Sequence, residues 1–440
     1  MNNLSPERSA PVYSYVLSWI VLAPLLYFCV HGALFWQHIG TNSALGSHLG
    51  EMAAGPSDST LSRAQNIGIF ILTMALAFTR LKSVALAATR YQVFIWLPVF
   101  AIVSALWSDD PAKSIYLGVF LLGNAIFAFY ISERFQPYDW MLLIRFVGFF
   151  AIFGSIALCI FFPQYGIDLK QSETNWQGIW THKNSCAIVT CYLLAPALFL
   201  RSYTLRDKFA NGTYILAGIF LIAMSQSRTG WIVFLCLLLT KGSIELISRF
   251  AGRERYTMAL LVASAAFIGI IALVFVMPVV LEAIGKDPTM TGRTQIWALV
   301  MVSIAQRPWI GYGYKAFWNG FQGAGASISF ALGNLVANAQ SGFLDTWLEI
   351  GIFGLLLTLY PFFSAFRASW RLILASSDSC TKFSVCVLMV TLVSNLDERS
   401  ANYPNFLEWV MFIVACVWLR NAVKAVRSVP ANVEVSALAA

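Results

Sequence analysis

Charged residues are scarce in this sequence: they make up 11% of its 440 residues, whereas hydrophobic residues make up 58%. A soluble globular chain of this length needs more charge to cover its surface, so that class of protein is excluded. Apolar runs near the ~20 residues that cross a hydrocarbon layer recur along the chain, and the mean hydropathy is +0.70. Because these runs are continuous and do not alternate with polar residues, they predict helices. The expected fold class is an all-α integral membrane protein.

Patterns for metals, disulfides and nucleic acids are also missing. Seven of the eight cysteines fall in apolar runs, and the eighth, Cys380, lies in a basic loop without a paired partner. The four histidines are scattered and show no metal-ligand spacing. The net charge of +8 is spread over the ends of apolar runs instead of forming one patch. We therefore expect no disulfide, no metal, no cofactor and no nucleic-acid partner.

Hydropathy predicts about twelve transmembrane helices in one polytopic domain, 1–440. The first span is expected to stay uncleaved, because "MNNLSPERSAP" and the apolar run after it lack a small-residue cleavage site. The expected spans lie roughly at 13–34, 64–79, 91–107, 114–131, 140–162, 184–200, 210–226, 230–248, 257–281, 345–366, 383–396 and 405–420.

The loops that carry cations predict the orientation. They fall on one face, which the positive-inside rule makes cytoplasmic, together with both termini. The long loop at about 282–344 then lies on the outer face, and its segment 294–307, which stops before Pro308, predicts a surface helix. The orienting groups are Arg80/Lys82/Arg90, Arg201/Arg206/Lys208, Arg249/Arg253/Arg255, Arg367/Arg371/Lys382 and Arg420/Lys424/Arg427.

Two arginines on the expected outer face need a separate explanation. Arg228 in "SQSRTG" lies beside hydrocarbon, where an unpaired guanidinium costs ~3 kcal/mol or more, and a snorkelling arginine is expected on the cytoplasmic face instead. Arg293 precedes a helix start, where free N–H groups favour an anion, although a plain surface cation is the alternative. Two converging guanidiniums form a fork for phosphate oxygens. The pattern predicts a site for a lipid pyrophosphate.

Several segments resemble the O-antigen ligase and polymerase superfamily (Wzy-type), on the side of the exopolysaccharide polymerases. They are "SQSRTG", "DPTMTGRTQIW…RPWIGYGY", "SGFLDTWLEIGIFG", "LWSDDPAKS", "PQYGI" and "GIWTHKNSCA", in family order over roughly residues 100–410. The resemblance implies a bacterial inner-membrane enzyme without cofactor that takes a glycan from an undecaprenyl-pyrophosphate donor at the periplasmic face. It passes that glycan to a hydroxyl of an acceptor glycan. Arg228 and Arg293 match the two arginines thought to bind the pyrophosphate.

One position departs from the family pattern. Family members often carry a histidine in an "HNGFLD"-like segment, read as the group that activates the acceptor, whereas this chain has "NAQSGFLD" with Gln340 at that place and Asn338 before it. Neither amide takes up a proton near neutral pH, so the base is displaced, supplied by the substrate or absent. His182 in "WTHKNS" is the substitute we predict, with a hydrogen-bonded cap as its alternative role.

Further polar residues are expected near the same face. Lys183 can add a third cation to the pyrophosphate, and Asn184 can cap the helix that follows. Asp345 and Glu349, four residues apart on one helix face, are expected to pair with an outer arginine. Glu398 and Arg399 are either a local ion pair or part of the acceptor path. Outer aromatic residues either stack on sugars or belong to the interfacial belt; they are Trp176, Trp180, Trp297, Trp309, Tyr312, Tyr314 and Trp318.

The predicted function is polymerisation of lipid-linked repeat units of a surface polysaccharide by a metal-independent membrane glycosyltransferase. Its partners would be the lipid-linked donor, a glycan acceptor and the bilayer, and proteins that regulate chain length or export are compatible with the resemblance. Three alternatives remain open: ligation to lipid A core, a catalytically weak relative, and a transporter or flippase for the same lipids. A transporter should carry midplane charges and two related halves, neither of which the sequence shows.

Overall fold

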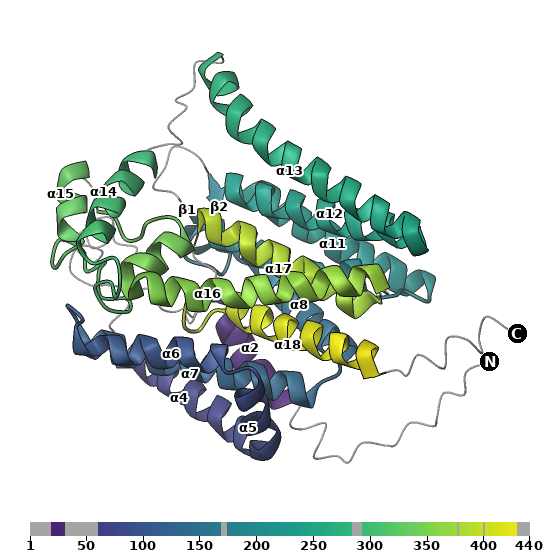
Figure 1. The fold of residues 1–440 in the computed structure, drawn as a ribbon, viewed down its shortest axis with the longest axis horizontal. Coiled ribbons are helices and arrows are strands. Elements are labelled where there is room, and N and C mark those ends of the chain that lie inside the picture. Colours follow the sequence, from purple (N-terminus) through teal and green to yellow (C-terminus); the bar gives the residue numbers. More distant parts are fainter. Residues whose placement is uncertain are drawn as a thin grey trace, which may run out of the picture.

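The computed structural model describes residues 19–30, 60–168, 174–283, 293–333, 335–375, 378–398 and 401–428, without the side chains of 60–62, 267, 269–283 and 427–428. Almost every element is a helix, and the long helices lie side by side as one bundle (Figure 1). The elements are α2 (Leu22–Cys29), α4 (Thr60–Phe78), α5 (Leu81–Arg90), α6 (Val93–Val103), η2 (Ser104–Leu106), α7 (Pro111–Arg134), α8 (Pro137–Phe161), α9 (Pro163–Gly166), β1 (Ile167–Asp168), β2 (Asn175–Trp176), α10 (Lys183–Leu194), η3 (Ala195–Leu198), α11 (Leu205–Ser225), α12 (Arg228–Ser248), α13 (Gly252–Ala283), α14 (Arg293–Gln306), α15 (Ala326–Leu332), α16 (Gly342–Ala375), α17 (Ser379–Asp397) and α18 (Leu407–Ser428). β1 and β2 pair antiparallel.

The expectation of a helical membrane protein is confirmed, but the count of twelve spans is not. Within the described ranges, seven helices are long and apolar enough to cross a membrane, or eight if the bent pair Arg63–Phe78 and Leu81–Arg90 is one span. Two expected spans are too short. α6 has 11 residues, and α10 has 12 residues before it tightens into η3. Of the expected first span, 13–34, residues 13–18 and 31–34 lie outside the described residues.

The helices begin where the chain supplies a cap. Asp110 accepts a hydrogen bond from the Lys113 backbone N–H at 3.1 Å, and Pro111 follows at the first helical position of α7. Ser227 caps α12 in the same way, by accepting from the Gly230 N–H at 3.0 Å. These caps satisfy backbone donors that would otherwise end near hydrocarbon unpaired.

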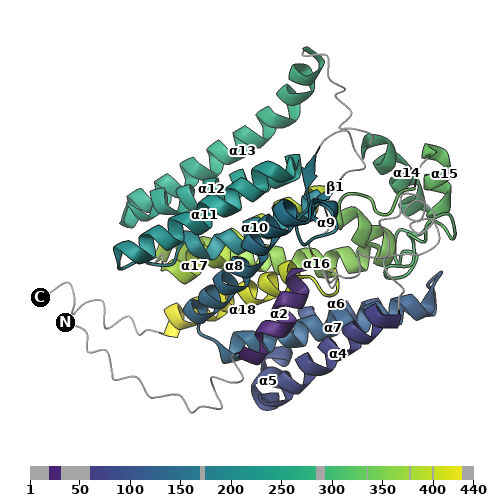
Figure 2. The same cartoon turned by 180° about the vertical axis from the view of Figure 1, so that it is seen from behind.

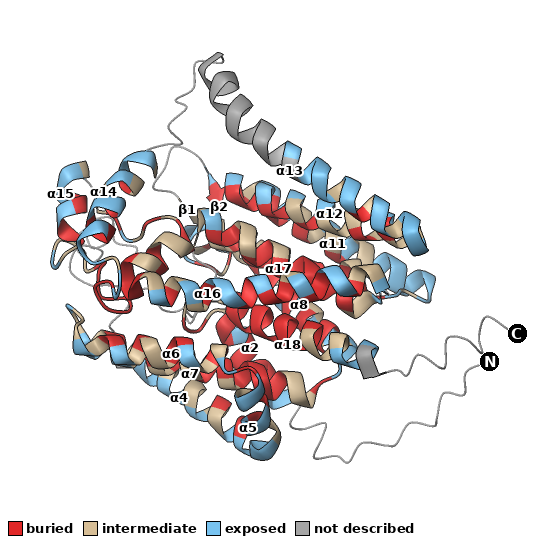
Figure 3. Cartoon of the chain, in the orientation of Figure 1, coloured by how far each residue is buried: buried red, intermediate tan, exposed pale blue. Residues whose placement is uncertain are grey.

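The interior of the bundle lies along α10, α17 and α18, which are buried along most of their length. Figure 3 shows the burial of α17 and α18. α13 lies at the margin of the bundle beside α12, and its described residues are mostly exposed. α10 is a short helix surrounded by longer ones, and every residue from Cys186 to Leu194 is buried. A helix in the interior of a bundle needs no polar face.

The chain breaks α16 at Ile350 and Gly351, where Gly351 has φ 68°. A Cβ at Gly351 would collide with the carbonyl of Trp309, so only glycine fits there. The loop that crosses the break satisfies its backbone: Tyr312 N–H donates to Leu348 O at 3.1 Å, and Gly313 N–H donates to Glu349 O at 2.8 Å. A helix can break at membrane depth only if freed carbonyls are paired in this way.

A second segment fixes the same loop from the other side. Ser114 Oγ donates to Tyr314 O at 2.8 Å, and Trp107 Nε1 donates to Ile310 O at 3.0 Å. Arg307 Nη1 lies 3.4 Å from Asp109 Oδ1. The signature segment 106–114 therefore anchors the loop that packs on the α16 break.

α14 and α15 lie together at one end of the bundle, beside the first half of α16, in both views (Figures 1 and 2). They have a small apolar core of their own, formed by Ile296, Val300, Ile304, Tyr312, Phe317, Trp318, Ile328, Val336, Ala339 and Leu348. This core and the loop contacts above position the first residue of α14.

Candidate active site at one end of the bundle

Helix ends from distant parts of the sequence are joined by side-chain contacts at the end of the bundle where α14 lies. The starts of α10, α12, α14 and α16 and the end of α17 take part. The contacts run in two connected chains, one through Asp397 and one through Glu398, which are adjacent at the end of α17.

Arg293, the first residue of α14, is held on two sides. Its Nη1 pairs with Asp397 Oδ1, and its Nε donates to Gln340 Oε1 at 2.7 Å. Its side chain is only 17% exposed. Burial lowers the pKa of the guanidinium from its ordinary value, and the charge of Glu398 opposes that shift. The group stays a cation with a fixed direction, because an arginine is not deprotonated in proteins.

Gln340 is oriented toward Arg293 by its own turn. Its φ is 50°, and its backbone N–H donates to Asn338 Oδ1 at 2.8 Å. Asparagine side chains commonly close such a turn on the backbone two residues later. The next carbonyl back, Ala339 O, accepts from Trp297 Nε1 of α14 at 2.9 Å. In this chain the position where the family resemblance leads us to expect histidine therefore supports an arginine.

Arg228 is brought into the same neighbourhood through its chain neighbour. The Thr229 hydroxyl donates to Asp397 Oδ2, the other oxygen of the carboxylate that pairs with Arg293. Arg228 is the first residue of α12, and its side chain is exposed. The structure thus joins the segments that carry the two arginines through one threonine and one aspartate.

Asn184 links three elements and does not cap α10, so the expectation of a cap there is wrong. Its Nδ2 donates to Glu398 Oε1 at 2.6 Å, and its Oδ1 accepts from Ser227 Oγ at 2.8 Å. The cap of α10 is His182, whose Nδ1 accepts from the Asn184 backbone N–H at 3.2 Å. A shift of α17 relative to α12 would break one of these two half-buried amide hydrogen bonds.

The cap geometry limits what His182 can do. A neutral imidazole that accepts through Nδ1 carries its proton on Nε2, which is then a donor. The side chain is exposed, so this N–H can reach a bound ligand, whereas uptake of a proton at Nε2 requires the other tautomer and loss of the cap. Lys183, the half-buried first residue of α10, lies next to it.

Asp345 and Glu349 serve the loop instead of the two arginines. Asp345 Oδ1 accepts from Trp318 Nε1 at 2.8 Å and from the Ala339 N–H at 3.0 Å. Glu349 Oε2 lies 3.2 Å from Lys315 Nζ, with both side chains under 10% exposed. Among the described residues, Glu349 forms its ion pair with a lysine, whereas the sequence predicted an arginine. Arg399, also expected near the site, lies outside the described residues.

Sequence reasoning missed three members of this network: Ser227, Thr229 and Asp397. Two of them flank Arg228 in "SQSRTG", and Asp397 precedes Glu398. The sequence could have indicated these three residues only because each is next to a predicted site residue. Their contacts depend on helix packing, because α12 and α17 are far apart in the sequence and come together only in the folded bundle.

The arrangement combines fixed cations with polar groups that can change partners. Arg228, Arg293 and Lys183 supply positive charge, and the start of α12 adds helix N–H groups. Asp397 and Glu398 balance part of that charge. Among the described residues, no group of three or more His, Cys, Asp and Glu side chains is placed to hold a metal ion. Such a surface suits a phosphorylated ligand.

Fold and site together define a helical membrane protein with a cationic site at one end of its bundle. Residues 213–359, which include Arg228, Arg293 and Gln340, match the O-antigen ligase family. The exopolysaccharide production protein ExoQ of Rhizobium meliloti (strain 1021) is 26% identical over 322 residues, which are 68% of this chain and 71% of that protein. The resemblance to the O-antigen ligase and polymerase superfamily, close to exopolysaccharide proteins, is therefore confirmed.

Proposed function

We propose that the protein is a membrane glycosyltransferase that polymerises oligosaccharide repeat units carried on undecaprenyl pyrophosphate. The observation that carries the proposal is that Thr229, the neighbour of Arg228, and Arg293 contact the same carboxylate, Asp397, at the end of the bundle. The superfamily supports a polysaccharide ligase or polymerase, and the likeness to an exopolysaccharide production protein favours the polymerase.

The donor pyrophosphate would bind across the two guanidiniums. Arg293 is already oriented by Gln340, so little side-chain entropy is lost when a phosphate binds it. The exposed Arg228 and Lys183 would contact the other phosphate, and Asp397 would give up part of its contact with Arg293. The lipid tail would extend into the bilayer from the same end.

The reaction exchanges one C–O bond for another. An acceptor hydroxyl oxygen attacks the anomeric carbon of the donor sugar, and the bond from that carbon to the pyrophosphate oxygen breaks. The pyrophosphate leaves with the bonding electrons, and the guanidiniums stabilise the charge that builds on it. The hydroxyl proton passes to a group on the protein. No metal takes part in this proposal.

Three groups at the site can take part in that proton transfer. His182 is the first, with the tautomer change described above. Glu398, held by Asn184, and Asp397, held by Thr229 and Arg293, are the others. Carboxylates serve as general bases in many enzymes. We favour Glu398, because Asp397 is committed to orienting Arg293.

We place the reaction at the periplasmic face of the bacterial inner membrane, with both termini in the cytoplasm. The basis is the positive-inside rule: most of the basic loops in the sequence connect the helix ends that lie opposite the candidate site. The glycan acceptor is the growing chain in a polymerase and lipid A core in a ligase. Proteins that set chain length or export the product would act on the same face.

The test is turnover by the purified full-length protein in proteoliposomes, supplied with a synthetic lipid-pyrophosphate oligosaccharide. We expect longer glycans on lipid together with release of free lipid pyrophosphate. Movement of the donor across the bilayer without bond exchange would identify a transporter, and binding without either would identify a catalytically weak relative. Transfer only when lipid A core is added would identify a ligase.

A further inference from the structure

A second cluster of cations lies where α5, α16 and α18 come together, away from the candidate site. Its members line a cavity of about 320 Å³, and no described residue that lines it is acidic. Five cations from three segments repel one another unless an anion lies between them. They are Arg90, Arg367, Arg371, Arg420 and Lys424.

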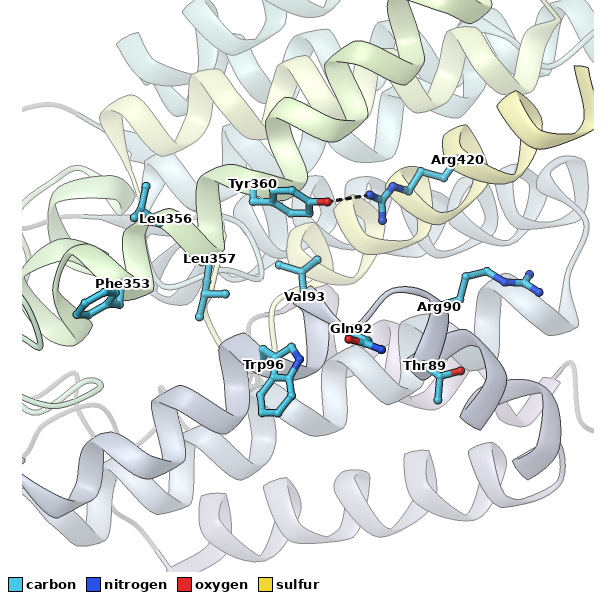
Figure 4. Close-up of a pocket in the computed structure, with 10 residues that line it drawn as sticks. All are labelled: Thr89, Arg90, Gln92, Val93, Trp96, Phe353, Leu356, Leu357, Tyr360 and Arg420. Atoms are coloured by element: carbon cyan, nitrogen blue, oxygen red, sulfur yellow. Dashed lines mark hydrogen bonds between the residues drawn. The ribbon is translucent and has the colours of Figure 1, made fainter. Parts of the chain in front are cut away.

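The cluster continues into an apolar groove between α6 and α16. Arg90 and Arg420 line both this groove, of about 720 Å³, and the basic cavity (Figure 4). Trp96 and Leu356, which line the groove, are 57% and 55% exposed. Large apolar side chains with that exposure lie against lipid in a protein of this class.

The groove runs along one face of α16, and the residues that line it change from apolar to basic along the helix. The lining residues recur at intervals of three and four, which keeps them on one side of the helix: Phe353, Leu357, Tyr360, Ser364, Arg367 and Arg371. The apolar part, from Phe353 to Ser364, rises about 16 Å along the helix. That length is close to one leaflet, which is half of the ~30 Å hydrocarbon layer.

Arg420 is held at the junction between the apolar and basic parts. Its Nη2 donates to the Tyr360 hydroxyl at 3.4 Å (Figure 4). Its guanidinium carbon lies 5.8 Å from the ring centre of Tyr91 and 6.0 Å from that of Tyr360. A ring from the turn between α5 and α6 and a ring from α16 thus hold a cation at the depth where a lipid phosphate would meet its acyl chains.

We propose that this groove is a binding site for an anionic glycerophospholipid. The phosphate contacts Arg420 and Arg90, the headgroup extends toward Arg367, Arg371 and Lys424, and one acyl chain lies along Trp96 and Leu356. The positive-inside rule alone would explain basic residues at these helix ends. It would not explain why cations from three segments line one cavity beside an apolar groove. Basic cavities between transmembrane helices commonly bind anionic headgroups. The proposal is independent of the reaction proposed above.

The test measures lipid binding to the delipidated full-length protein by native mass spectrometry. Dioleoyl phosphatidylglycerol, dioleoyl phosphatidylcholine and soluble glycerol phosphate are titrated separately. We expect phosphatidylglycerol to bind first and at least about tenfold more tightly than the other two, because only it offers both a net negative charge and acyl chains.

Matched variants separate the groove from general surface charge. Arg367→Gln with Arg371→Gln should weaken phosphatidylglycerol binding at least about tenfold, whereas Arg206→Gln with Lys208→Gln, exposed cations off the groove, should change it less than about twofold. Trp96→Ala should weaken the lipid and leave glycerol phosphate unchanged. Equal binding of phosphatidylcholine, tight binding of glycerol phosphate alone, or equal losses in the two charge variants would each overturn the proposal. Thermal unfolding of every variant controls for folding.

Discussion

Arg228 is exposed at the first turn of α12, so its charge does little for stability and its shape matters for the proposed reaction. An ammonium cannot make the two parallel hydrogen bonds of a guanidinium to a phosphate. We therefore expect Arg228→Lys to lower turnover at least about 100-fold, the usual effect of losing one charge-stabilising contact. Turnover with saturating donor is the measurement, and Arg206→Lys, at an exposed site off the network, is the control. Full activity of Arg228→Lys would contradict the assignment.

His182 and Glu398 can be distinguished by two substitutions that preserve their structural contacts. Asparagine caps helices well, so His182→Asn keeps the α10 cap and removes only proton transfer. Gln at 398 can still accept from Asn184, but it cannot take a proton.

We expect His182→Asn to keep turnover within about threefold and Glu398→Gln to lose at least about 100-fold, the usual contribution of a general base. Protein levels and unfolding temperatures should stay near those of the unchanged chain. The reverse pattern of turnover would make His182 the base, as the sequence predicts.

At the scale of elements, the break in α16 is supported by a buried ion pair. Lys315 and Glu349 lie 3.2 Å apart beside the break, and the Lys315 ammonium lies 4.3 Å from the ring centre of Tyr403. Removal of one partner leaves the other charge buried, which typically costs 3–5 kcal/mol. The pair thus ties the segment between α14 and α15, which carries Lys315, to α16 and to the segment before α18.

We expect Glu349→Leu to lower the free energy of unfolding by about 3 kcal/mol or more. The measurement is denaturation with sodium dodecyl sulfate in mixed micelles. Lys315→Met combined with Glu349→Leu should recover much of that loss, because no buried charge is left. A double variant as unstable as the single one would show that the pair does not act as a unit.

At the scale of the whole molecule, the candidate site and the lipid groove differ in chemistry. The candidate site mixes cations with carboxylates, whereas the described residues that line the basic end of the groove include five cations and no carboxylate. The distribution of basic loops predicts that the candidate site is periplasmic and the basic end of the groove cytoplasmic.

Cysteine labelling tests this orientation in cells. Thr181→Cys and Arg206→Cys place a thiol at exposed positions beside the candidate site and at the start of α11. In a Cys380→Ser background, an impermeant maleimide should label Thr181→Cys in intact cells and Arg206→Cys only after the inner membrane is opened. The opposite result would invert the topology and with it the periplasmic reaction.

Some of the site was predictable because its chemistry is local. Arg228 and Arg293 stand out from single segments, since a guanidinium beside hydrocarbon or at a helix start needs an anion. Asp397 and Thr229 were not, because an aspartate at a helix end has many possible partners until α12 packs beside α17. The count of twelve spans is not confirmed for a related reason. Hydropathy does not distinguish a short helix buried by its neighbours, such as α10, from one that crosses lipid.

The sequence by itself determined a helical membrane protein and its resemblance to the O-antigen ligase and polymerase superfamily, because long apolar runs have only one stable form in hydrocarbon and the signature segments are contiguous. The tertiary structure decided which polar groups meet. It placed Asp397 between the two arginine segments, turned Gln340 toward Arg293, and joined basic ends of three separate segments at an apolar groove. Such contacts link residues far apart in the chain, and their geometry depends on how the helices pack.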